Sequence, residues 1–267
     1  MGERQDGRLI AQANETNVLR ALHRFGWLRT RDLACLVWQS WAKSPAKGEP
    51  SLTPPQANRS DIRMAQRTLA RLREHKLILT SKAPNGSLIH ALSEKGARAL
   101  QALGIPAITG KDQLRDYHAA YFLHRNIANE VAISGILSGY RVATEREIAQ
   151  GLWLGGMEGI LGKKPDVLVR TGNLVWWVEV ERSRKNQKDY AKLLKWLEAI
   201  WKPSQRLGEP APLTKQVQVR QVVFICTAAF AKKLATDLLT RGWSPEQFAT
   251  RVRCEKYLYS FEAISFF

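Results

Sequence analysis

The sequence predicts a mixed α/β chain in two parts that differ in their pattern. In the first part, three segments with helical spacing precede two short strands around a tight turn. In the second part, a helix precedes three strands, and a nearly continuous apolar strand follows the next helix. An apolar strand after a helix indicates a parallel crossover in a sheet that is covered on both faces. The chain has 267 residues, enough for two domains with substantial cores.

The charge composition alone indicates which class of partner the chain binds. The chain has 41 Lys and Arg against 24 Asp and Glu, a formal net charge of +17. Such a surplus indicates a polyanionic partner, with nucleic acid the leading candidate and an acidic protein the alternative. The hydrophobic fraction of 45% excludes a disordered chain.

Cysteine usage and hydropathy predict a cytoplasmic protein that has no membrane contact. Cys35, Cys226 and Cys254 lie far apart and form no CxxC motif, which fits a reducing compartment and excludes a thiolate zinc site. No apolar run approaches the roughly 18 residues of a membrane helix. The first residues, Met1–Asp6, lack the apolar region of a signal peptide.

The first part of the chain, residues 1–103, is expected to be a DNA-binding domain. Residues 14–40 read as two short helices that are separated at Gly26, with Thr30 as the N-cap of the second. A third helix begins at about Asp61. A linker over residues 104–112 then precedes a second domain over 113–267.

A β-hairpin follows the third helix. Ile78–Thr80 and Leu88–His90 flank Pro84–Gly86 as strand, turn and strand, and Ser93 can cap the next helix. Three helices and then a hairpin is the order of a winged helix-turn-helix, whose third helix enters the major groove while the hairpin touches the DNA backbone. The basic residues expected to face DNA are Arg59, Arg63, Arg67, Arg71, Arg73 and Lys82. A solvated charged face, or a protein contact, is the alternative.

The second domain is expected to have the order α-β-β-β-α-β-α. A glycine-rich stretch from Gly151 to Gly162 is expected to be a mobile loop. The expected elements are helices over 113–137, 189–201 and 228–241 and strands over 140–144, 167–170, 174–181 and 217–226.

Acidic side chains follow the central hairpin of this domain. Asp166 begins one strand, and Glu179 and Glu181 share one face of its neighbour, because side chains alternate along a strand. We expect the carboxylates of Asp166 and Glu179 to meet at one end of the sheet. Converging carboxylates repel unless a cation lies between them, and oxygen ligands suit Mg²⁺ or Mn²⁺.

This segment resembles the PD-(D/E)xK nuclease superfamily, which has a restriction-endonuclease-like core. The resemblance implies that Asp166, after Pro165, and Glu179 hold a metal ion and that a lysine assists the attacking water. Glu181 stands at the usual lysine position, so a relocated lysine must serve, and Lys185 or Lys188 is the candidate. The superfamily often adds an upstream carboxylate, for which Glu145 and Glu147 are available.

The whole arrangement, over about residues 14–240, resembles the MobC-type plasmid mobilization relaxases and the related replication-relaxation family. The matching stretches are TEREI, KPDVLVR and WVEVERSRKNQKDYAKLLKW. The resemblance implies a nuclease that nicks one strand of duplex DNA at an origin of transfer, together with an accessory protein and a coupling ATPase. It implies a site formed by Asp166, Glu179 and Lys185, with Glu145 and Glu181.

Other readings stay open. His118 and His124 point to different faces of their helix, so they cannot form a paired metal site there. Tyr190 is the choice if a covalent link to DNA forms, although no histidine cluster supports that mechanism. The tryptophans mostly pack, with one or two near the cleft free to stack on unpaired bases. The alternative functions are a non-catalytic DNA-binding regulator or accessory factor on a degenerate nuclease fold, which Glu181 favours, and a protein-interaction scaffold.

Overall fold

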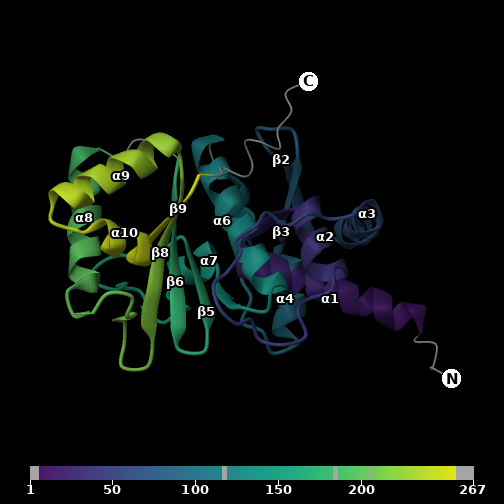
Figure 1. The fold of residues 1–267 in the computed structure, drawn as a ribbon. Coiled ribbons are helices and arrows are strands. Elements are labelled where there is room, and N and C mark those ends of the chain that lie inside the picture. Colours follow the sequence, from purple (N-terminus) through teal and green to yellow (C-terminus); the bar gives the residue numbers. More distant parts are fainter. Residues whose placement is uncertain (1–5, 116–118, 183–185, 205, 257–267) are drawn as a thin grey trace. The chain divides into compact units, whose positions relative to one another are not determined.

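The computed structural model describes residues 6–115, 119–182, 186–204 and 206–256 of a mixed α/β chain. The chain forms two compact units (Figure 1). The first comprises Met1–Trp41 and Thr53–Leu123, and the second comprises Ala42–Leu52 and His124–Phe267. Sequence analysis draws the division at residues 104–112, whereas these units divide inside a helix. Within the described residues, no helix is long and apolar enough to span a bilayer.

The first unit combines helices with a small antiparallel sheet. Its three strands lie in the order β1-β3-β2. Its elements are α1 (Gly7–Phe25), β1 (Trp27–Arg29), α2 (Thr30–Trp38), α3 (Arg59–Glu74), β2 (Ile78–Lys82), β3 (Leu88–Leu92), α4 (Glu94–Gln101) and α5 (Lys111–Arg115). The expected hairpin is confirmed as β2 and β3, and Ser93 caps α4 by accepting a bond from the Gly96 N–H.

The predicted cap of α2 is wrong. Thr30 is the first residue of the helix, and the short strand β1 runs up to Arg29. The Asp32 carboxylate accepts a 2.9 Å bond from the Arg29 backbone N–H and pairs with the Arg29 guanidinium at 2.7 Å. A buried ion pair therefore sets the start of the helix. A strand of three residues is too short to show an alternating pattern in sequence.

The second unit contains the larger sheet, with strand order β4-β5-β6-β8-β7 and with β9 paired to β8. The expected parallel crossover is confirmed, because β6 and β8 are parallel and α8 connects them. The elements are α6 (Ala119–Leu137, which begins in the first unit), β4 (Arg141–Ala143), α7 (Glu145–Ala149), β5 (Val167–Thr171), β6 (Leu174–Glu181), α8 (Gln187–Trp201), β7 (Ala211–Pro212), β8 (Gln218–Cys226), α9 (Ala228–Thr240), α10 (Pro245–Arg251) and β9 (Val252–Glu255).

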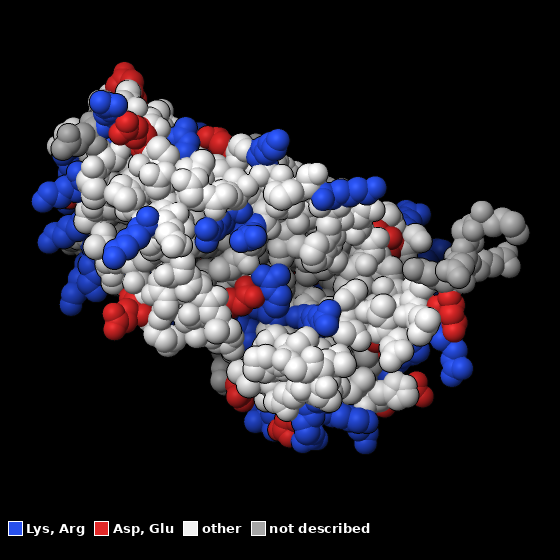
Figure 2. Space-filling model, turned by 90° about the horizontal axis from the view of Figure 1, so that it is seen from below, with Lys and Arg blue, Asp and Glu red and all other residues white. Residues whose placement is uncertain are grey.

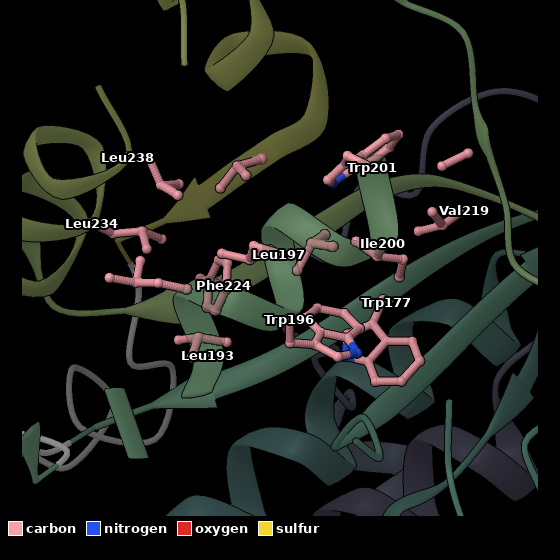
Figure 3. Packing of buried hydrophobic residues seen from close by; sticks show 14 of the residues in the cluster. Trp177, Leu193, Trp196, Leu197, Ile200, Trp201, Val219, Phe224, Leu234 and Leu238 are labelled. Carbon is pink, nitrogen blue, oxygen red and sulfur yellow. The ribbon is translucent and has the colours of Figure 1, made fainter. Parts of the chain in front are cut away.

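Helices cover both faces of this sheet (Figure 1). On one face, Trp177 of β6 packs on Trp196 of α8 with ring centroids 4.6 Å apart, and residues of β8 and α9 complete the cluster (Figure 3). On the other face, α6 comes so close at Gly135 that an added Cβ would lie 2.9 Å from the Val142 side chain. Both faces of β6 are therefore buried, and polar side chains on this strand need partners.

Residues 42–52 join the second unit through backbone carbonyls. The Arg253 guanidinium donates a 2.9 Å bond to the Pro50 carbonyl, and the Tyr140 hydroxyl donates a 3.2 Å bond to that of Gly48. A further bond runs from the Thr171 hydroxyl to the Ala46 carbonyl. This segment thus separates two stretches of the first unit in sequence while it packs with the second.

Gly96 in α4 generates a stability prediction. A Cβ added there would lie 2.1 Å from the Leu77 carbonyl oxygen, which is rigid backbone. Gly96→Ala should lower the free energy of unfolding by about 1–3 kcal/mol, although Gly→Ala in a helix ordinarily stabilises. Gly7→Ala, at an exposed helical position with no atom within 4 Å, is the matched control and should be neutral or stabilising. Urea titrations measure both free energies of unfolding. Equal changes in the two variants would contradict the close contact between Gly96 and the Leu77 carbonyl.

Candidate active site

Asp166 lies directly before β5, where the chain enters the sheet. Its backbone N–H donates to the Val178 carbonyl at 3.0 Å, which continues the pairing with β6. One carboxylate oxygen accepts a 2.7 Å bond from the Val180 N–H, and the other lies 3.1 Å from Nε2 of His124 on α6. The Asp166 carboxylate is therefore fixed on both oxygens, between a strand and a helix.

Glu179 lies within β6 and is only 3% exposed. One carboxylate oxygen accepts a 2.7 Å bond from the Lys163 ammonium. The other accepts a 2.6 Å bond from the Trp177 indole, two residues earlier on the same strand face, as the alternation of side chains predicts. A buried carboxylate thus has a cationic partner and a neutral donor.

Lys163 links the two acidic positions. Its ammonium bonds to Glu179, and its charge also helps to lower the pKa of Asp166. Sequence analysis missed this lysine, although it stands three residues before Asp166 in a Lys-Lys-Pro-Asp run. Of the predicted lysines, Lys185 lies outside the described residues and Lys188 is exposed in the first turn of α8.

His124 has a partner that the helix pattern does not indicate. The predicted relation is to His118, which lies outside the described residues, whereas the partner in the structure is Asp166, at the start of a strand. Burial lowers the pKa of His124, but the charge and hydrogen bond of Asp166, with the charges of Glu145 and Glu181, raise it to about 9. Desolvation likewise raises the pKa of Asp166, and the His124 cation, the Val180 N–H and Lys163 reverse that effect and hold it low.

The remaining predicted carboxylates have different surroundings. Glu145 begins α7, and its carboxylate lies 3.8 Å from Nε of Arg125. Glu181 ends β6 and is 5% exposed. Both act on His124 through their charge, so they belong to the same electrostatic neighbourhood. Glu147, in contrast, forms a capping box with Thr144 and serves the start of α7.

The aromatic candidates are structural. Burial and Asp237 raise the pKa of Tyr190, the opposite of what an activated phenolate nucleophile needs. The expectation that the tryptophans mostly pack is confirmed for Trp176, Trp177 and Trp196, which are buried in the core. Trp153 is partly buried and packs against Trp177.

The carboxylates of this site can be compared with the ligands that the expected metal ion requires. Asp166 and Glu179 offer hard oxygen ligands of the kind that Mg²⁺ and Mn²⁺ prefer. Both carboxylates are already bonded on each oxygen, and within the described ranges no group of three His, Cys, Asp or Glu is arranged to hold a metal ion. The donor chemistry fits the metal, and binding would require His124 or Lys163 to exchange places with it.

Five arginines of the first unit lie on α3. This helix buries Ala65, Thr68 and Leu72 on its inner face. Its exposed arginines are Arg59, Arg63, Arg67 and Arg73. Arg71 pairs with Glu15 at 2.8 Å, and Lys82 is exposed at the end of β2. Figure 2 shows that Lys and Arg are spread widely over the face it presents and that Asp and Glu are sparser there.

Comparison with known proteins adds no assignment. No family model, curated protein or solved structure matches this chain. The functional argument therefore depends on the residues themselves and on their geometry.

The His124–Asp166 pair predicts a pH dependence of stability. The pKa of His124 rises from its ordinary 6.5 to about 9, so its stabilisation is complete below pH 6.5 and is lost as the pH rises through about 9. Melting temperatures from pH 6 to 10 should show wild type exceeding His124→Gln by a margin that shrinks toward pH 10. The exposed His75→Gln is the control and should follow wild type. A margin that stays constant with pH would contradict a charged pair.

Proposed function

We propose that the chain is a DNA-binding protein whose second unit carries a metal-dependent endonuclease site. The observation that carries this proposal is the placement of Asp166 and Glu179 at the neighbouring ends of β5 and β6, with the Lys163 ammonium acting on both. Two carboxylates and a lysine at one sheet end are the groups that phosphodiester hydrolysis needs.

The order of elements in the second unit supports the same proposal. Helix α6 precedes β4, β5 and β6, and α8 leads into the parallel strand β8. The PD-(D/E)xK resemblance leads us to expect this α-β-β-β-α-β order, with α7 and β7 as additions. By the same resemblance to mobilization relaxases, we propose that the product is a nick in one strand of a duplex, made with the help of an accessory protein.

For the first unit we propose a winged helix-turn-helix. Three helices, α1 to α3, precede the β2–β3 hairpin, and β1 pairs with β3 to complete a small sheet. Helix α3, with its exposed arginines, would occupy the major groove, and Lys82 at the end of the hairpin would contact phosphates.

In the proposed reaction, Asp166 and Glu179 would hold Mg²⁺ or Mn²⁺. A bound divalent metal lowers the pKa of water and polarises a phosphate oxygen. The Lys163 ammonium would stabilise the negative charge that develops on the phosphate. His124, charged at neutral pH, holds the Asp166 carboxylate between α6 and the sheet.

A non-catalytic DNA-binding factor is the second candidate, and the same bonds favour it. All four carboxylate oxygens of Asp166 and Glu179 have donors within the protein. Glu181 occupies the position where a nuclease of this kind has lysine. If this second candidate is correct, the ion pairs stabilise a nuclease-like fold that has lost its catalytic activity.

Cleavage decides between the two candidates. Wild type with Mg²⁺ or Mn²⁺ should convert supercoiled plasmid with its native flanking DNA to open circle. Asp166→Asn and Glu179→Gln should abolish conversion, and Lys163→Met should slow it by about 10²–10³-fold. The matched control is Glu198→Gln, a half-exposed carboxylate on α8 paired with Arg241. If Asp166→Asn nicks like wild type, the catalytic proposal is wrong; if all the proteins bind and none nicks, the second candidate stands.

The α3 arginines predict how duplex binding depends on salt. Arg63→Ala combined with Arg67→Ala should weaken binding and reduce the slope of log K against log salt by about 2, because two phosphate contacts are lost. Fluorescence anisotropy between 50 and 300 mM NaCl measures both quantities. Arg206→Ala, an exposed arginine of the second unit with 84% of its side chain accessible, should leave the slope unchanged. Equal effects of the two changes would refute a specific role for α3.

A further inference from the structure

The glycine-rich segment between α7 and β5 presents apolar side chains to solvent. We call residues 151–164 the apolar loop. Leu152, Met157 and Leu161 are 65%, 63% and 63% exposed, among the highest values for large hydrophobic residues in the described part of the chain. The loop ends at Lys163 and Lys164, directly before the candidate site. An exposed apolar group beside basic residues calls for a ligand with both apolar and anionic parts.

Tryptophans hold the apolar loop against the core of the second unit. Trp153 packs edge-on against Trp177 at 5.8 Å, and its indole donates a 2.7 Å bond to the Gly156 carbonyl. The indole of Trp196, which lies beside Trp177 in Figure 3, donates a 3.0 Å bond to the Ile160 carbonyl. These contacts attach the base of the loop, whose exposed tip is the part that is expected to be mobile.

Leu161 has a backbone conformation that disfavours its own side chain. Ile160 and Lys163 exchange backbone bonds of 2.8 and 3.1 Å, which closes a two-residue turn over Leu161 and Gly162. Both central residues have positive φ, 52° and 72°, and such turns ordinarily contain Asn or Gly. A leucine there is strained, and at 63% exposure its burial does not offset the strain.

A leucine that is both strained and exposed is a candidate for ligand binding, because neither its conformation nor its burial explains its presence. The tip of the turn is two residues from Lys163, whose ammonium bonds to Glu179. Nucleic acid has the matching chemistry, because phosphates suit the lysines and base faces suit an apolar side chain. Leu and Met side chains inserted between base steps unstack them and bend the duplex.

We propose that Leu161 is a wedge that inserts between bases beside the candidate site and holds the DNA locally unstacked. This inference depends on the proposed function, since it requires that the chain binds DNA. Opening the duplex beside the site would expose one strand to Asp166, Glu179 and Lys163. The occupant of the loop is therefore DNA whose bases are unpaired or readily unpaired.

A duplex with a preformed opening tests the wedge. Two 30-base-pair probes would be compared, one fully paired and one with a central three-base mismatch bubble that contains 2-aminopurine. Wild type should bind the bubble about tenfold more tightly, since the bases of the bubble are already unpaired and need not be unstacked by the protein, and 2-aminopurine fluorescence should rise. Leu161→Gly and Leu161→Asn should lose the preference and the fluorescence change while binding the paired duplex like wild type.

The variants keep the test independent of folding. Gly and Asn both tolerate positive φ, so their thermal midpoints should equal or exceed that of wild type. Leu239→Gln, an apolar residue of α9 that is 42% exposed, is the matched control and should keep the preference.

Three results would overturn the inference, and they have different meanings. If wild type shows no preference for the bubble, or if Leu161→Asn keeps it, Leu161 is not a wedge even though DNA binds. If Leu161→Asn instead abolishes self-association in sedimentation velocity and keeps the preference, the loop contacts a second copy of the chain. If wild type binds neither probe at low salt, the proposed function itself fails.

Discussion

The structure of the second unit depends on charged side chains that are buried beside its sheet. Placing a carboxylate in an apolar strand costs several kcal/mol unless a cation or strong donors accompany it. Glu179 is 3% exposed between valines, and Lys163 and Trp177 satisfy it. Lys163 comes from the end of the apolar loop, and His124 of α6 contacts the neighbouring Asp166, so α6, β6 and the loop end must all be in place together. An apolar residue at this position would avoid the cost of burying a charge, and under the proposed function the carboxylate is needed to hold a metal ion.

The two units use positive charge in opposite ways. On α3 the arginines are exposed, where long-range attraction to a polyanion is effective and reversible. At the sheet end, Lys163 and His124 are largely shielded and each contacts one carboxylate. Exposed cations increase the rate and strength of encounter, whereas shielded cations create a local field that solvent does not dilute. The proposed function, DNA binding followed by cleavage, would use both.

Local patterns in the sequence predicted most elements, and tertiary partners determined the rest. The β5–β6 hairpin, the Ser93 cap and the β6–α8–β8 crossover followed from alternation, capping chemistry and apolar runs. The partnership of His124 with Asp166 spans 42 residues and has no local signal. Lys163 precedes Asp166, whereas the superfamily pattern places its lysine after Glu179, so the pattern does not indicate Lys163. Periodicity shows which residues share a face, but it does not show which distant side chain meets them.

Residues 42–52 determine whether the two units can be separated in the sequence. They bond to Tyr140, Thr171 and Arg253, while the segments before and after them fold in the first unit. Neither unit is therefore a single uninterrupted stretch of sequence. A single cut in the chain cannot separate the two units, because residues 42–52 of the second lie between two stretches of the first. An exchange of residues 1–123 as one block would remove residues 42–52 and, with them, these bonds of the second unit. Sequence changes that alter the first unit therefore have to leave residues 42–52 in place for the second.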